Sequence, residues 1–134
     1  MAKAPKPTES ELAILRVLWT LGPSTVREVH DHMAGSRSVA YTTTLKTLQV
    51  MTAKGLTNRE DHRGQHLYKP RHAEEETLRR LVTDLLDQAF GGSTSKLVVQ
   101  ALASRRASPE ELQEIRDLLA SEDAEARTKK GKVE

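Results

Sequence analysis

Three consecutive threonines, Thr42 to Thr44, open a segment that otherwise has the pattern of a good helix, residues 41–54. Threonine is a mediocre helix former, because its branched Cβ loses rotamer freedom against the preceding turn. Its hydroxyl can hydrogen-bond to base edges or phosphates, and its methyl group can contact the C5 methyl of thymine. With Lys46 one turn further on, Thr42 and Thr43 therefore carry chemistry suited to DNA contact.

The apolar positions of this segment predict which side chains point outward. If Tyr41, Leu45 and Leu48 face the core, the outward positions are Thr42, Thr43, Lys46 and Gln49 or Val50. A recognition helix places such a face, weighted to its N-terminal turns, in the major groove. We expect Thr43 and Lys46 to contact bases. Candidate DNA-binding residues here are Tyr41, Thr42, Thr43, Lys46 and Gln49. The alternative is that the threonines form only a solvated face.

A basic hairpin is predicted to follow. Residues 56–60 and 65–70 have the pattern of two short strands, and Gly64 in the turn between them can take a positive φ. Arg59 and Arg63 are the candidate phosphate contacts, which would position the protein on DNA without reading its sequence. Because acidic residues lie nearby, an ordinary charged hairpin is the alternative.

Catalytic and metal chemistry find little support in the sequence. The chain has no cysteine, which excludes disulfides, thiolate metal sites and a cysteine nucleophile. His30 and His32 are two residues apart on a helix and point to different sides, so they cannot bind one metal ion together. His62 and His66 could face each other across the hairpin as a weak zinc site, or could simply be solvated. No Ser/His/Asp spacing or phosphate loop is present. We expect no enzyme, no metal and no cofactor.

The elements that would position these residues have clear sequence signals. Residues 8–11 and 25–28 are capping boxes, each predicting the start of a helix. The second helix is expected to reach about Met33, and residues 34–38 to form a turn before the third. Three short helices and a hairpin predict a winged helix-turn-helix, mostly α with a small β-hairpin, over residues 8–70.

Residues 73–120 predict a helical dimerisation arm. A helix over residues 73–90 begins with three glutamates, and two further helices follow, the last capped at Ser108. Their apolar stripes exceed what a lone arm could cover, which predicts that a partner subunit covers them. The candidate dimerisation residues are Leu78, Leu81, Val82, Leu85, Phe90, Leu97, Val98 and Leu102. Residues 121–134 are expected to form a flexible charged tail.

Composition and charge agree with two different roles for the two halves. The chain has 134 residues and a net charge of +2. Residues 1–70 hold ten Lys and Arg against six Asp and Glu, whereas residues 71–120 hold seven against nine. A basic first half is expected to face an anion. No apolar run approaches membrane-spanning length and the N-terminus lacks a signal peptide, so we expect a cytoplasmic, nucleoid-associated protein without membrane contact of its own.

In the order and spacing of several short stretches the chain resembles the penicillinase-repressor family of bacterial transcription regulators, the BlaI/MecI/CopY type. The stretches are "TESELAILRVLW", "GPSTVREV", "AYTTTLKTL", "KGL", "RGQHLYKP" and "FGGS". The resemblance implies a homodimeric repressor that binds palindromic operators, typically with TACA/TGTA-like half-sites. A winged-helix module for protein interaction without sequence-specific DNA binding is the alternative.

The resemblance also implies signals that relieve repression. At the residues that receive these signals, this sequence departs from the family. Copper-responsive members carry a Cys-x-Cys tail, which a chain without cysteine lacks. β-Lactam-responsive members are cleaved at an Asn-Phe bond by a membrane-sensor-linked protease, and the matching positions here are Gln100 and Ala101. The possible cleavage site therefore differs in sequence. The other possibility is that this helix only forms the interface of a repressor controlled in another way.

Overall fold

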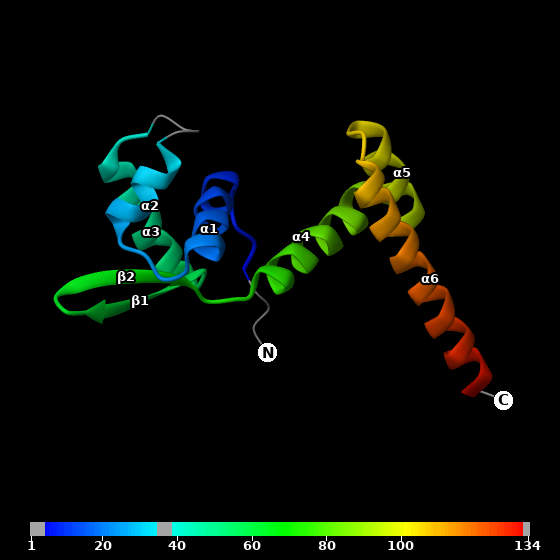
Figure 1. The fold of residues 1–134 in the computed structure, drawn as a ribbon. Helices are drawn as coiled ribbons and strands as arrows, with labels where there is room; N and C mark the ends of the chain where they lie inside the picture. The colour runs from blue at the N-terminus through cyan, green and yellow to red at the C-terminus, as the bar shows by residue number, and fades with distance from the viewer. Residues whose placement is uncertain (1–4, 35–38, 133–134) are drawn as a thin grey trace. The chain divides into compact units, whose positions relative to one another are not determined.

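In the computed structural model, six helices and two strands follow one another along the chain, and residues 5–34 and 39–132 are described (Figure 1). The elements are α1 (Glu9–Leu21), α2 (Val26–Met33), α3 (Tyr41–Lys54), β1 (Thr57–His62), β2 (Gln65–Pro70), α4 (Glu74–Ala89), α5 (Thr94–Ser104) and α6 (Pro109–Lys132). Most of the turn predicted at residues 34–38 lies outside the described residues. No helix in the described part is long and apolar enough to cross a membrane.

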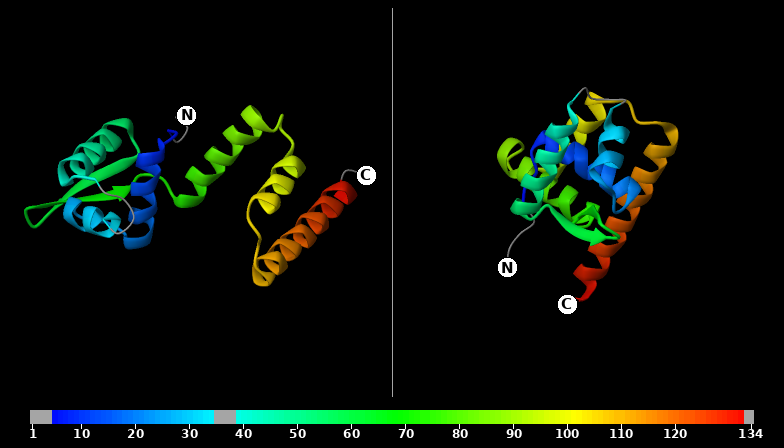
Figure 2. Two further views of the ribbon diagram at one scale, coloured as in Figure 1. Left: turned by 90° about the horizontal axis from the view of Figure 1, so that it is seen from above. Right: turned by 90° about the vertical axis from the view of Figure 1, so that its left-hand side faces the viewer.

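The chain divides into two compact units, residues 1–85 and residues 86–134. The first unit holds the three helices and the hairpin that the sequence predicts. Figures 1 and 2 show the hairpin extending beyond these helices, with its turn away from them. This is the winged helix-turn-helix fold expected from the sequence.

Both predicted capping boxes are present at the starts of α1 and α2. The Thr8 hydroxyl accepts from the backbone N–H of Glu11, and the Glu11 carboxylate accepts from the backbone N–H of Thr8. Thr25 and Glu28 repeat the arrangement. Each box satisfies two backbone donors that a helix start would otherwise leave without partners. These residues therefore fix where both helices begin.

A single apolar core joins the three helices to the hairpin. Leu18, Val29, Leu48 and Met51 are fully buried, and Tyr68 from β2 reaches the same cluster. Burying an aliphatic side chain of this size contributes about 1.5–3 kcal/mol. The inward face of α3 is thus fixed by its packing, which determines the direction of its opposite face.

The hairpin pairs antiparallel strands from Thr57 opposite Pro70 to His62 opposite Gln65. Ser24, between α1 and α2, exchanges two backbone hydrogen bonds with Tyr68 on the other edge of β2, at 2.9 and 2.8 Å. The base of the hairpin is therefore tied to the helical core, while its tip is free to extend.

The helices α4, α5 and α6 have the starts that the sequence predicts. The Ser93 hydroxyl caps α5, and Ser108 with Glu111 forms a capping box before α6. The prediction of a flexible tail is corrected for residues 121–132, because α6 continues to Lys132. Alanine, glutamate and arginine predominate in residues 122–127, and these strong helix formers extend a helix without a core contact.

Candidate nucleic-acid interface

The outward face of α3 is the one predicted from its apolar pattern. Thr42, Thr43, Lys46 and Gln49 are exposed, whereas Thr44, next in sequence to Thr43, is buried. Successive residues of a helix lie about 100° apart, so the three threonines divide between two faces. Two of them are presented to solvent and the third belongs to the core.

The hydroxyls of Thr42 and Thr43 hold no protein partner within the part of the chain that the structure describes. By contrast, the Thr47 hydroxyl donates to the carbonyl oxygen of Thr43 at 2.8 Å. A hydroxyl bonded to its own helix backbone is less available to a ligand. Thr42 and Thr43 thus keep their donor and acceptor capacity for an external group, and Thr47 uses part of its own internally.

The exposed face of α3 forms one wall of a groove of about 450 Å³, whose other wall is the start of α1. Thr8 and Ser10 line it together with Thr43 and Lys46. The sequence identified Thr8 only as a helix cap, and nothing in its local pattern marked Ser10 as a neighbour of the third helix. Hydroxyl-bearing residues of two helices thus line the same groove as Lys46, a combination suited to an anionic, hydrogen-bonding ligand.

Glu11 lies in this groove, but its charge is compensated. Both of its carboxylate oxygens accept from the Lys54 ammonium, at 2.8 and 2.9 Å. Burial alone raises the pKa of Glu11, but the hydrogen bonds from Lys54 and from the Thr8 backbone outweigh it and hold that pKa below the ordinary value of 4.5. The paired carboxylate therefore repels an approaching phosphate less than a free one would.

Tyr41, the first residue of α3, is partly buried and packs against the core. Its ring meets the His30 ring edge to face, with centroids 5.6 Å apart. The guanidinium of Arg27 lies over it, 4.4 Å from the ring centroid. Tyr41 was predicted both to face inward and to contact DNA, and the structure shows a covered ring at the edge of the outward face. Arg27 was not among the predicted site residues.

The hairpin turn presents Arg63 at its tip. Arg63 and Gly64 have φ values of 51° and 81°, the pattern of the two-residue type I′ turn that suits twisted strands. Positive φ is ordinary for glycine but uncommon for arginine. An exposed arginine thus occupies a position that asparagine or glycine would fill with less strain.

Arg59, the other predicted phosphate contact, is engaged within the hairpin. Its guanidinium lies 3.9 Å from the carboxylate of Asp61, which also binds His66 across the strands. The zinc pairing considered for His62 and His66 is wrong, because His62 lies opposite Gln65 and adjacent strand positions point to opposite faces. Within residues 5–34 and 39–132, no three potential ligands gather around a metal position.

The predicted dimerisation residues lie on faces that the single chain does not cover. Thr77 is buried, and none of the described side chains of residues 78–128 is buried. Between 39% and 46% of the residue surface is exposed at Leu78, Val82, Leu85, Val98 and Leu102. Leu81, Phe90 and Leu97 are half-buried. Val99, Leu118 and Leu119 are more exposed still and were not predicted.

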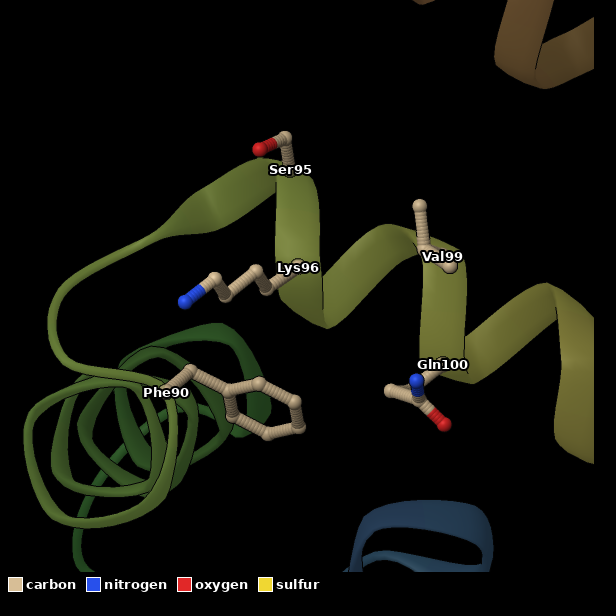
Figure 3. Close-up of a pocket in the computed structure, with 5 residues that line it drawn as sticks. All are labelled: Phe90, Ser95, Lys96, Val99 and Gln100. Carbon is tan, nitrogen blue, oxygen red and sulfur yellow. The ribbon is translucent and has the colours of Figure 1, made fainter.

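Gln100 and Ala101, the predicted cleavage position, lie in the exposed third turn of α5. Figure 3 shows the Phe90 ring turned toward Lys96 and Gln100. These side chains line a hollow of about 350 Å³. Side-chain access to this position is therefore open in the single chain.

Comparison with known proteins places the chain among bacterial regulators. The family model described as penicillinase repressor matches residues 7–121. Transcriptional regulator BlaI of Mycobacterium tuberculosis strain H37Rv is 36% identical over 90 residues, 66% of this chain and 65% of that protein. The match thus spans slightly less than two thirds of the relative's length.

Two solved structures match the chain at low sequence identity. The solution structure of the Bacillus licheniformis BlaI monomeric form in complex with the blaP half-operator has a TM-score of 0.50 at 22% identity, over 57% of this chain and 93% of that one. A MarR family protein from Bacillus stearothermophilus has a TM-score of 0.49 at 19% identity, over 90% of this chain and 76% of that one. The first agrees with the winged-helix architecture described above.

Proposed function

The chain belongs to the penicillinase repressor family, and from that premise we propose that it is a transcriptional repressor that binds operator DNA as a homodimer. The observation that carries the proposal is the exposed face of α3, where Thr42, Thr43 and Lys46 have no competing role in the core. In this proposal α3 lies in the major groove and the hairpin contacts the flanking backbone.

In this proposal, different residues contact the base edges and the phosphates that position the protein on DNA. Thr43 and Lys46 contact base edges, because they lie in the first turns of the recognition helix, where the groove is approached most closely. Thr42 and Gln49 flank them on the same face. Arg63 contacts a phosphate from the hairpin tip. Arg59, which is also paired with Asp61, contributes a second positive charge to the positioning of the hairpin. The monomeric form of Bacillus licheniformis BlaI has been solved in complex with the blaP half-operator, which supports one winged domain per half-site.

Dimerisation supplies the partner that the arm lacks. Apolar faces that remain about two-fifths exposed along α4 and α5 lose contact with water when a second copy covers them. Pairing also links two winged domains, so that both halves of a palindrome with TACA/TGTA-like half-sites are bound together. The second binding event is then intramolecular, which raises the overall affinity without new base contacts.

We further propose that a membrane-sensor-linked protease relieves repression by cutting near Gln100 and Ala101. Both residues are exposed, and α5 buries no side chain that would resist the local opening a protease needs. Cleavage there detaches α6 and part of α5 from the arm, which weakens the dimer and leaves the winged domain folded. Intact-mass measurement of the chain from cells exposed to a β-lactam tests this. A fragment ending between Val98 and Ala103 is expected, and a full-length mass after derepression would exclude cleavage.

The rival function is a winged-helix module that binds proteins, and binding to DNA at several salt concentrations separates the two. The probes are a duplex with a TACA/TGTA palindrome and a scrambled duplex of equal length. A repressor prefers the palindrome and loses affinity steeply as salt rises, because bound cations are released from DNA. A chain that binds neither duplex at low salt is an interaction module instead.

A further inference from the structure

Arg27 occupies a position beside the start of the recognition helix that its place in the sequence did not indicate. It lies on α2, yet its guanidinium is stacked on the ring of Tyr41, the first residue of α3, 4.4 Å from the ring centroid. About 65% of its side chain remains exposed. A cation is therefore held over the first residue of α3, which precedes the exposed threonines in sequence, instead of moving freely in solvent.

The ring that supports this cation is itself held from two sides. The His30 ring packs edge to face on Tyr41, and His30 Nδ1 lies 3.1 Å from the hydroxyl of buried Thr44. Arg27 and His30 are three residues apart on α2, so both lie on the face that meets α3. Tyr41 thus connects an exposed arginine to a buried part of the interhelical contact.

Stacking leaves the guanidinium able to bind an anion. A guanidinium that lies over an aromatic ring is attracted through its charge, so its in-plane N–H donors stay available to an anion. A lysine on the same stem would carry the charge without this planar fit. Asp31, one turn further along α2, lies 4.0 Å from the guanidinium and is 64% exposed. At that distance and exposure it moderates the charge of Arg27 without neutralising it.

We propose that Arg27 contacts a DNA phosphate at the edge of the major groove and that Tyr41 is its positioning residue. The inference rests on the proposed DNA-binding function and adds a backbone contact on α2 to those of α3 and the hairpin. When the first turn of α3 enters the groove, the neighbouring phosphates lie at the edge of the groove, where the first helix of a helix-turn-helix crosses the backbone. The negative charge of Asp31 repels the same phosphate and so weakens this contact.

The test uses the full-length chain and measures its affinity for the palindromic and scrambled duplexes over a series of salt concentrations. Arg27→Ala is expected to weaken binding to both duplexes alike, by about three- to tenfold, and to reduce the slope of log affinity against log salt by about 0.9. Asp31→Asn is expected to strengthen binding to both. Arg27→Lys is expected to restore the slope but only part of the affinity.

Variants of Tyr41 separate positioning from a direct contact. Tyr41→Phe keeps the ring that supports Arg27 and is expected to retain the slope of log affinity against log salt. Tyr41→Leu removes the ring and is expected to weaken binding in the wild-type chain, but not further in the Arg27→Ala chain. Equal losses in both backgrounds would show that Tyr41 does not act through Arg27, and circular dichroism confirms that each variant is folded.

The outcomes for the inference and for the proposed function are distinct. A wild-type chain that prefers the palindrome, together with an Arg27→Ala variant of unchanged salt slope, would overturn the inference and leave the function standing. A loss that is confined to the palindrome would assign Arg27 to base reading and would also overturn it. A wild-type chain without affinity for either duplex would overturn both.

Discussion

Lys54, the last residue of α3, donates hydrogen bonds to both carboxylate oxygens of Glu11 in the first turn of α1, over 2.8 and 2.9 Å. The two residues are 43 positions apart. Glu11 is almost fully buried and also accepts from the Thr8 backbone at 2.8 Å. One carboxylate therefore joins the cap of α1 to the end of α3 and fixes the two walls of the groove relative to each other.

Replacing Glu11 by glutamine is expected to lower the free energy of unfolding by about 1–3 kcal/mol, because the amide cannot accept from Lys54 as a carboxylate does. Urea denaturation measures the change. Glu28→Gln is the matched control, since Glu28 completes the other capping box but is exposed. It is expected to cost less than about 1 kcal/mol. Equal losses in the two variants would show that the Lys54 pair adds nothing.

The same carboxylate predicts a dependence of stability on acid. The pKa of Glu11 lies below 4.5 in the folded chain, so the unfolded chain binds this proton more readily. The stabilisation is therefore complete above about pH 5 and is lost as the pH falls through the folded-state pKa. Urea denaturation from about pH 6 to pH 3 is expected to show a steeper loss for the wild type than for Glu11→Gln. Parallel curves would contradict this assignment.

Thr43→Ala is expected to weaken binding to the palindrome by about 1–3 kcal/mol and to relax the preference at one position in each half-site. Affinities for a set of single-base variants of the palindrome measure this. Thr43→Ser keeps the hydroxyl and removes the methyl group, so it distinguishes a hydrogen bond from a thymine contact. A loss without any change in base preference would remove Thr43 from the reading face.

Arg63→Asn is expected to weaken binding to every duplex and to reduce the salt slope by about 0.9, because one phosphate contact is lost. Asparagine tolerates the positive φ of this turn, so the hairpin keeps its shape. Arg63→Lys, which retains the charge, is the control and should keep the slope. An unchanged slope in the asparagine variant would leave the tip of the hairpin without a role in binding.

Leu85→Asp is expected to split the proposed dimer, because the charge would be buried between two copies. Leu85 is 46% exposed in the single chain, so the monomer should tolerate the change. Sedimentation velocity measures the association state, and Thr83→Asp on the opposite side of α4 is the control. A Leu85→Asp chain that remains dimeric would place the interface elsewhere, whereas loss of helix content would show that Leu85 packs within its own subunit.

Local signals predicted much of the first unit. The capping boxes at Thr8 and Thr25 set two helix starts, and the apolar spacing of α3 placed Thr42 and Thr43 outward. These features depend on residues within one or two turns of one another, which is the range that periodicity and capping describe. The contacts with DNA themselves stay a prediction, since the orientation of a face does not identify its ligand.

Contacts between distant residues were not predicted. Neither the pairing of Glu11 with Lys54 nor the stacking of Arg27 on Tyr41 leaves a local pattern, because each depends on how two helices pack. The tail was misjudged for another reason. Its polar residues suggested disorder, but residues 122–127 have a high helix propensity, and α6 continues without needing an apolar face.

For the proposed homodimer, the absence of buried side chains from residues 78–128 would make cellular abundance part of the regulatory response. An arm without its own core gains its apolar burial only in the pair, so the population of paired chains rises with the square of the monomer concentration when most chains are single. A twofold fall in copy number then leaves only about a quarter of the pairs. In such a repressor, gene dosage and the rate of synthesis would set how sharply transcription resumes, without any change in the residues proposed to meet the operator.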